Sequence, residues 1–166
     1  MKKIALTVFI LLMLPVSLFA MEIREIGRVE TNKGELKVQS NQAGDVYLDL
    51  ASIRVKFNED EKDDLLGALE TAVDFAGKAE RTDITLTVKT GGIKQKTSSG
   101  LATGISVYFN TEGGKSRIFL ILKDFSTALF VKAYISTEQC EELVSLLRKS
   151  IEKSQSIEDQ LKLFEL

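Results

Sequence analysis

The sequence predicts an α+β fold built from two repeated units, each with about four antiparallel strands followed by one amphipathic helix. Two observations support this prediction. The stretch from Ile53 to Ala76 has the pattern of a strand, a helix cap and a helix whose apolar residues recur at the 3.6-residue period. The same pattern returns near the C-terminus, in the stretch VKAYISTEQCEELVSLLRKSIE. Because a single offset aligns both copies, we expect an internal duplication, with the sheets packed against the two helices.

The two predicted helices begin with matching signals. Asn58 and Ser136 are good N-caps, and Glu61 and Gln139 lie three residues later, where a capping-box partner belongs. The apolar positions also match, since Leu65, Leu66, Leu69 and Val73 align with Leu143, Val144, Leu147 and Ile151. The repeats are therefore expected at residues 21–79 and 83–154, within a single domain of residues 21–166 that ends in a helical tail.

The first 20 residues have the features of a secretory signal peptide. Lys2 and Lys3 form a basic start, an apolar run covers Ile4–Leu14, and a short exit ends at Ala20. We expect cleavage after Ala20, so that the protein is secreted or periplasmic and keeps no membrane span; an uncleaved anchor is the alternative. Without Lys2 and Lys3, the 22 basic residues fall to 20 against 24 acidic ones. This mild acidity argues against a nucleic-acid specialist.

Within the first repeat, alternating apolar and polar residues predict strands, and turn residues separate them. We expect strands at Met21–Val29, Glu35–Ser40, Val46–Leu50 and Ile53–Phe57, followed by a helix from Glu59 to Lys78. Gly67 lies inside this helix and predicts a close approach by a neighbouring element, and Gly77 marks the end of the helix.

The second repeat has the same order. We expect strands at Asp83–Lys89, Ile105–Asn110, Arg117–Lys123 and Ala128–Ile135, followed by a helix from Thr137 to Ser154. Four glycines predict that Thr90–Gly104 is a long loop, and the second and third strands are expected to form a hairpin. The tail residues Ile157, Leu161 and Phe164 keep helical spacing and either extend the helix or pack separately.

Side chains suited to catalysis are scarce. The chain has no histidine, which removes the commonest general base and the commonest transition-metal ligand. Its single cysteine, Cys140, lies in register with the apolar stripe of the second helix, so a buried hydrophobic role is expected. The acidic run 59–64 opens a helix, where carboxylates are stabilising, and lacks the spacing of a calcium loop. We therefore predict a non-enzymatic protein without catalytic, cofactor or metal sites; only a pocket with two convergent carboxylates would favour a small hydrolase.

Aromatic and basic residues gather on the strands, opposite the predicted core positions. The candidate binding residues are Arg54, Lys56, Tyr108, Phe119, Phe130, Lys132 and Tyr134. A second sheet face of this composition favours binding to a partner. The alternative is that both faces of the strands are buried, one under the helices and one against the other repeat.

The layouts LKVQSNQAGDVYLDL…IRVKFNEDEKDDLLGAL and ISVYFNTEGGKSRIFLIL…VKAYISTEQCEELVSLL support a resemblance at the level of fold. In strand order and turn placement they are similar to the duplicated fold of the PC4, Pur-alpha and Whirly single-stranded nucleic-acid-binding proteins. The resemblance covers nearly all of the chain after the signal segment. It implies that basic and aromatic residues of the sheet, here Arg54, Lys56, Phe130, Lys132 and Tyr134, would hold a strand by phosphate contact and base stacking. Export and mild acidity depart from that family.

We expect a non-enzymatic exported domain that binds a protein or a component of the cell envelope through a sheet face, without a cofactor. A secreted single-stranded nucleic-acid-binding protein is the alternative function. A homodimer is compatible with both.

Overall fold

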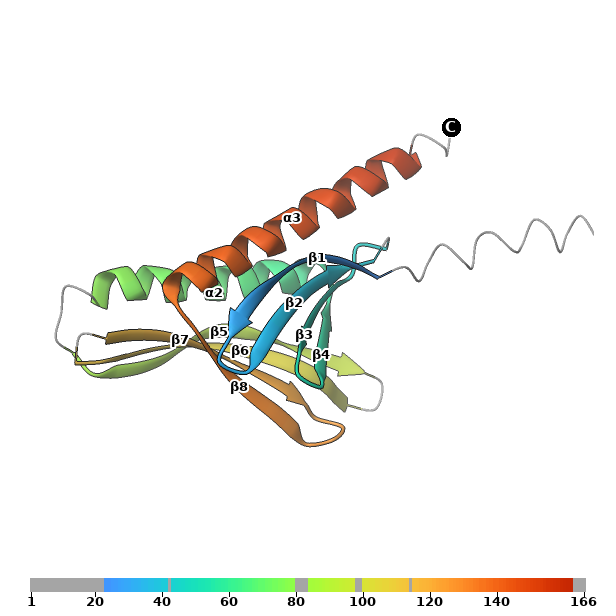
Figure 1. The fold of residues 1–166 in the computed structure, drawn as a ribbon. Helices are drawn as coiled ribbons and strands as arrows, with labels where there is room; N and C mark the ends of the chain where they lie inside the picture. The colour runs from blue at the N-terminus through green and yellow to red at the C-terminus, as the bar shows by residue number, and fades with distance from the viewer. Residues whose placement is uncertain (1–22, 42, 80–83, 98–99, 114, 163–166) are drawn as a thin grey trace, which may run out of the picture.

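The computed structural model describes residues 23–41, 43–79, 84–97, 100–113 and 115–162 (Figure 1). The predicted signal segment, residues 1–20, lies outside the described residues. In chain order the elements are β1 (Arg24–Thr31), β2 (Gly34–Ser40), β3 (Val46–Leu50), β4 (Ile53–Phe57), α2 (Glu59–Ala79), β5 (Leu86–Thr97), β6 (Gly100–Glu112), β7 (Lys115–Asp124), β8 (Leu129–Ile135) and α3 (Thr137–Lys162). This order confirms an α+β fold in which a layout of four strands and one helix occurs twice.

The strands form two four-stranded antiparallel sheets, in which each strand pairs with its neighbours along the chain. The order is β1-β2-β3-β4 in the first sheet and β5-β6-β7-β8 in the second. Figure 1 shows α2 and α3 together on one side of the sheets. The opposite face of each sheet, which points away from the helices, is called its outer face below.

Each helix packs mainly on the sheet of the other unit. The helix α2 follows the first sheet but contacts β5, β6 and β7, whereas α3 follows the second sheet but contacts β1 and β2. The two helices also contact each other. Buried apolar residues from both sheets and both helices form one cluster. Because neither unit covers its own sheet, burial of the core requires both units.

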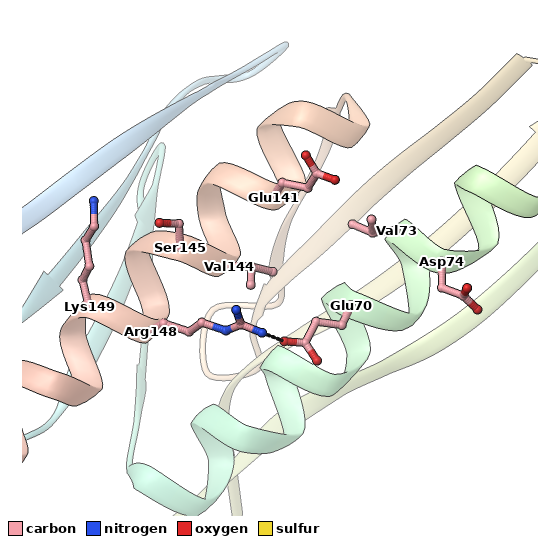
Figure 2. A pocket seen from close by; sticks show the side chains of 8 residues that line it. All are labelled: Glu70, Val73, Asp74, Glu141, Val144, Ser145, Arg148 and Lys149. Carbon is pink, nitrogen blue, oxygen red and sulfur yellow. Dashed lines mark hydrogen bonds and ion pairs between the residues drawn. The ribbon is translucent and has the colours of Figure 1, made fainter.

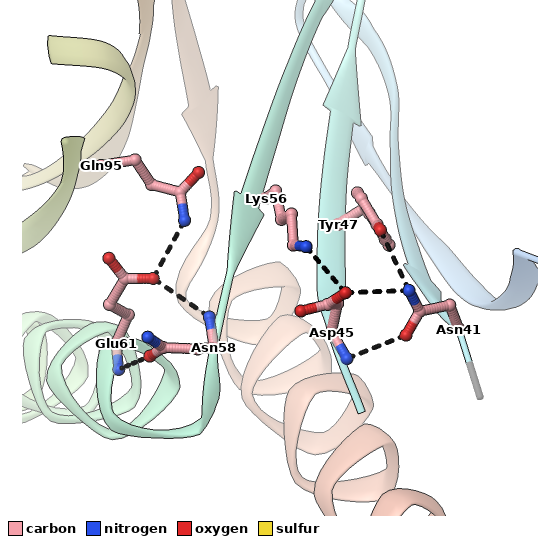
Figure 3. Close-up of polar contacts among 7 residues, drawn as sticks. All are labelled: Asn41, Asp45, Tyr47, Lys56, Asn58, Glu61 and Gln95. Carbon is pink, nitrogen blue, oxygen red and sulfur yellow. Dashed lines mark hydrogen bonds and ion pairs between the residues drawn. The ribbon is translucent and has the colours of Figure 1, made fainter. Parts of the chain in front are cut away.

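Both helices begin with the predicted capping box. The Asn58 side chain accepts from the Glu61 N–H at 3.0 Å, and the Glu61 carboxylate accepts from the Asn58 N–H at 3.0 Å. Ser136 and Gln139 make the same reciprocal pair, at 3.2 and 2.8 Å. Glu61 also accepts a hydrogen bond from Gln95 of β5 at 3.1 Å (Figure 3). The start of α2 is therefore joined to the sheet on which it packs.

The apolar stripes of the two helices face the core as predicted. The second helix is longer than the predicted range Thr137–Ser154. Leu69 and Leu147, at the middle of the two stripes, are fully buried. The helix α2 continues through Gly77 to Ala79, so Gly77 does not end it. The helix α3 continues to Lys162, which extends it into the tail; Phe164 lies outside the described residues.

The prediction of a loop at Thr90–Gly104 is wrong. The strands β5 and β6 pair through the described part of this stretch, with Ile93 opposite Ile105 and Lys94 opposite Gly104. Gly91, one of the glycines that suggested a loop, instead borders a β-bulge, where the register shifts between Lys89 and Gly91, and Gly92 pairs with Ser106. A Cβ on Gly92 would lie 2.2 Å from the backbone oxygen of Ile105, so this position has no room for a side chain.

The prediction of a close approach at Gly67 is also wrong, because no atom lies within 4 Å of a Cβ built there. The close approaches occur instead at glycines of the first strand in each sheet. A Cβ on Gly91 would lie 2.7 Å from the Cβ of Ala68 in α2, and a Cβ on Gly27 would lie 2.5 Å from Cδ2 of Leu146 in α3. Ala68 and Leu146 occupy matching positions of the two repeats. Each helix thus crosses the other unit's sheet over a glycine.

Candidate binding face

The pleat of the second sheet brings three aromatic side chains into one row across its outer face. The register places Tyr108 of β6 opposite Phe119 of β7, and Phe119 opposite Tyr134 of β8. The rings of Tyr108 and Phe119 are stacked, with centroids 4.9 Å apart and an interplanar angle of 1°, and Tyr134 is tilted against Phe119 at 5.7 Å. We call Tyr108, Phe119 and Tyr134 the aromatic row.

A lysine covers the centre of the aromatic row. Nζ of Lys132 lies 4.0 Å from the ring centroid of Phe119 and 5.0 Å from that of Tyr134. These are cation–π distances. Because Lys132, Tyr108 and Tyr134 all pack against it, Phe119 is only 6% exposed and does not itself offer a ring to a partner. The accessible parts of this arrangement are the ammonium group and the flanking tyrosine rings.

Basic residues surround the aromatic row on the same outer face. Cross-strand pairing places Lys89 beside Tyr108 and Arg117 beside Asn110. Lys123 lies between Gly104 and Phe130, and Gly104 in turn pairs with Lys94. Among the described residues of these strands, Glu112 is the one carboxylate on this face, and it lies opposite Lys115 at the end of the β6–β7 hairpin. Among the described residues, no ion pair is formed by Lys89, Lys94, Arg117, Lys123 or Lys132.

Phe130 lies at the edge of this face and is 69% exposed. It stands across from Lys123 on β7, two residues from Lys132 along β8. Tyr108, Lys132 and Tyr134 are partly exposed. The alternative in which both faces of these strands are buried therefore does not hold for the outer face of the second sheet.

Arg54 and Lys56 lie elsewhere, on the outer face of the first sheet, where each is neutralised by an aspartate. Nη2 and Nε of Arg54 lie 2.6 and 2.7 Å from the two carboxylate oxygens of Asp49, a bidentate pair. Nζ of Lys56 lies 2.8 Å from Asp45 (Figure 3). The hydrogen bond to Asp49 raises the pKa of Arg54, and the hydrogen bond to Asp45 raises the pKa of Lys56. The seven candidate residues thus occupy two faces instead of one.

Polar contacts hold this neutralised arrangement in place. The Asn41 amide donates to Asp45 at 2.9 Å and to the Tyr47 hydroxyl at 3.1 Å (Figure 3). The guanidinium group of Arg54 lies 5.7 Å from the centroid of the Tyr47 ring. Arg54 and Lys56 are therefore already engaged within the protein, and on this face only Lys37 has no ion pair among the described residues, whereas five basic residues of the second outer face have none.

The β1–β2 turn supports the edge strand that carries Tyr134 and Lys132. The side-chain oxygen of Asn32 accepts from the Tyr134 N–H at 2.7 Å, and the Asn32 N–H donates to the Tyr134 carbonyl at 3.5 Å. Residues distant in sequence meet here, so periodicity could not identify Asn32. The face position of Lys123 and Arg117, by contrast, could have been found from their even spacing relative to Phe119 along one strand.

A groove of about 560 Å³ lies between α2 and α3 (Figure 2). Arg148 of α3 bridges it, with Nη2 2.6 Å from a carboxylate oxygen of Glu70 of α2. The other carboxylates lining the groove, Asp74 and Glu141, do not point toward each other. The groove therefore does not contain the convergent carboxylate pair that would favour a small hydrolase.

Cys140 is buried in the core, as its position in the apolar stripe predicted. Its thiol lies 3.8 Å from the carbonyl oxygen of Leu69. Burial, together with the charge of Glu141, raises the pKa of the Cys140 thiol to about 12. At neutral pH the group is a protonated thiol and a poor nucleophile.

The described residues contain no cluster of three or more cysteine, aspartate and glutamate side chains that could hold a metal ion. No described helix combines the length and the apolar composition that a membrane span requires. Comparison of the chain with protein families, with curated proteins and with solved structures gives no match. The assignment of a function therefore depends on the residues of the two outer faces.

Proposed function

We propose that the protein is an exported, non-enzymatic binding domain whose outer face of β5–β8 captures an anionic partner, either an acidic protein surface or a component of the cell envelope. The face combines a cationic rim with partly exposed aromatic rings. Such a surface attracts negative charge over a distance and adds short-range contacts once the partner has docked.

The difference between the two outer faces supports this proposal. On the first sheet, Arg28, Arg54 and Lys56 each contact a carboxylate within the protein. On the second sheet, basic residues stand around the aromatic row without such partners among the described residues. A protein whose net charge is −2 over its full sequence thus concentrates uncompensated positive charge on one face.

A second candidate function, binding of single-stranded nucleic acid, is favoured by the aromatic row itself. Stacked rings beside cations are the arrangement with which such proteins hold bases and phosphates. The Tyr108 and Tyr134 rings flank Phe119 on an open sheet, but Lys132 covers the central ring. A strand would have to displace this lysine before it could stack on Phe119, so we place this function second.

The two functions are separated by fluorescence-anisotropy titrations with two probes, a labelled polyglutamate peptide and a labelled mixed-sequence oligonucleotide. We expect the peptide to bind, and Lys123→Gln and Lys132→Gln each to weaken its affinity by roughly threefold, because each removes one exposed charge. The matched control is Lys37→Gln, which removes the same charge from the outer face of the first sheet and should leave the affinity unchanged.

An equal loss in the Lys37→Gln control would show that net charge, and not this face, determines binding, and would contradict the proposal. For the oligonucleotide we expect no binding tighter than about micromolar in physiological salt. The second function would be established instead by nanomolar affinity with two further properties. The logarithm of the affinity should fall against the logarithm of the salt concentration with a slope of about −0.7 per phosphate contact, and Tyr134→Ala should weaken the binding free energy by about 1–3 kcal/mol.

A further inference from the structure

Three large apolar side chains are exposed near the turn between β7 and β8; Phe125 and Phe130 lie on the outer face, whereas Leu129, which precedes Phe130 along β8, lies on the opposite face at the end of the strand. Phe125 is 37% exposed, Leu129 51% and Phe130 69%. All three lie within six residues of one another, at one end of the second sheet. The other exposed large apolar residues of the described chain, Ile23, Ile84 and Leu86, lie at or near the start of other strands. We call Phe125, Leu129 and Phe130 the apolar tip.

The turn that presents the apolar tip is built by specific contacts. Asp124 accepts hydrogen bonds from the Ser126 N–H at 2.9 Å, from its hydroxyl at 2.6 Å and from the Thr127 N–H at 3.3 Å. These bonds lower the pKa of Asp124, so its carboxylate stays charged and keeps this role at neutral pH. The turn ends at Ala128 in a left-handed conformation, with φ of 56°. The tip is therefore presented by an ordered turn, which reduces the entropy lost when it binds.

Phe125 is held on the outer face beside the lysines. Its N–H donates to the carbonyl of Ala102 at 3.0 Å. Its ring lies over Gly104, where a Cβ would come within 3.3 Å of Cε2 of Phe125. Gly104 pairs with Lys94 on one side and Lys123 on the other. The glycine thus leaves room for the phenyl ring over a strand position whose cross-strand neighbours are Lys94 and Lys123.

The charge around the apolar tip is positive. Lys94 and Lys123 lie in the cross-strand row that contains Phe130, and Lys132 lies in the next row of the same face. In the described part of the chain, none of these three lysines is paired with a carboxylate. The carboxylate of the turn is that of Asp124, and it accepts hydrogen bonds from the backbone N–H groups of Ser126 and Thr127.

From this juxtaposition we propose that the β7–β8 turn inserts its apolar tip shallowly into an anionic lipid bilayer, while Lys94, Lys123 and Lys132 contact the headgroups. The inference builds on the proposed function, since it names the anionic envelope component as the membrane surface. Aromatic and aliphatic side chains flanked by lysines are suited to the boundary between headgroups and acyl chains. Each lysine near an anionic surface adds favourable energy.

A bilayer fits this surface better than a second copy of the chain. A symmetric contact of tip with tip would bring the same lysines of both copies together, and like charges across an interface oppose association. The apolar side chains stand at the end of a hairpin and not in a groove, so a protein partner would need a matching pocket. Lipids move aside and require none.

The chain contains no tryptophan, so a single introduced tryptophan reports on one site. We would compare Phe130→Trp with the control Leu86→Trp. Leu86 is 43% exposed and lies at the opposite end of the same sheet. Both full-length variants are mixed with vesicles of phosphatidylcholine alone and of phosphatidylcholine with phosphatidylglycerol. We expect the emission of Phe130→Trp to shift to shorter wavelength on the anionic vesicles only, and that of Leu86→Trp to stay unchanged.

Vesicle co-sedimentation supplies the second measurement. The double change Leu129→Ser and Phe130→Ser should reduce binding to the anionic vesicles by roughly tenfold or more, because two large apolar side chains are no longer buried. The matched change Ile84→Ser and Leu86→Ser should have no effect. Far-UV circular dichroism of each variant verifies that the sheet is intact.

Three results would overturn the lipid inference: no wavelength shift in Phe130→Trp, an equal shift in Leu86→Trp, or a shift that appears without vesicles as protein concentration rises. The last would identify a second copy as the occupant. If the protein does not bind the anionic vesicles but Lys132→Gln still weakens polyglutamate binding, the proposed function is retained and only the lipid inference is rejected. If both assays fail, the outer face of β5–β8 is not a binding surface.

Discussion

The crossing of α3 over β1 gives the sharpest test of the exchanged helices. In Gly27→Ala the new Cβ would lie 2.5 Å from Cδ2 and 3.2 Å from Cδ1 of Leu146. Carbon atoms pack best at about 3.5–4.0 Å, so the nearer contact is too short by about 1 Å. Leu146 is only 9% exposed and has little space into which it can move. We therefore expect Gly27→Ala to destabilise the protein by about 1–3 kcal/mol, the usual consequence of overpacking.

The partner of this clash is tested by a double-mutant cycle. Leu146→Ala alone should cost about 2–5 kcal/mol, because it leaves a cavity. In the Leu146→Ala background the added methyl group has room, so Gly27→Ala should become neutral or slightly stabilising. The coupling free energy between the two changes is then about 1–3 kcal/mol. Urea unfolding followed by far-UV circular dichroism measures each free energy.

Gly67→Ala is the matched control for this cycle. Its Cβ would meet no atom within 4 Å, and alanine is the better helix former, so stability should rise by about 1 kcal/mol. If Gly27→Ala and Leu146→Ala were additive within about 0.5 kcal/mol, α3 would not cross β1 at this point, and the exchange of helices between the units would be refuted.

Two further predictions concern the core. Leu69→Ala and Leu147→Ala should each cost about 2–5 kcal/mol in urea melts, because both residues are fully buried at mid-stripe; a loss below about half a kcal/mol would place that helix at the surface. The pKa of the Cys140 thiol is raised from 9.0 to about 12 in the folded protein, so folding favours the protonated form. Its stabilising effect is complete below pH 9 and decreases as the pH rises toward 12. The Cys140→Ala variant should therefore lose less stability across this interval, and a parallel pH dependence in both proteins would contradict the burial of the thiol.

Local features of the helices could be predicted because they depend on residues close in sequence. The capping boxes at Asn58 and Ser136 require only a side chain and a backbone group three residues away. The stripes that contain Leu69 and Leu147 follow from one period. Periodicity shows that a helix has a buried side, but it does not show which sheet covers that side. The exchange of helices between the two units was accordingly not predicted.

Glycines and charged residues on strands were harder to interpret, because their roles depend on partners distant in sequence. A glycine beside a bulge, such as Gly91, and a glycine in a loop give the same local signal. Arg54 and Lys132 likewise have similar surroundings in sequence, yet Arg54 is paired with Asp49 while Lys132 lies over Phe119. Strand register decides which basic residues remain available, and register was not part of the prediction.

The exchange of helices also has a consequence for symmetry. A single unit of this kind could bury its core only by trading helices with an identical copy, and such a symmetric dimer would display two identical outer faces. Any substitution would then appear on both sides at once. Joining the units in one chain removes this restriction, so the two faces can carry different side chains. On one face Arg54 and Lys56 are paired with Asp49 and Asp45, while the other leaves Lys123 and Lys132 without an ion pair among the described residues. Because the two units are joined in one chain, the outer face of one sheet can acquire binding residues that the outer face of the other sheet lacks.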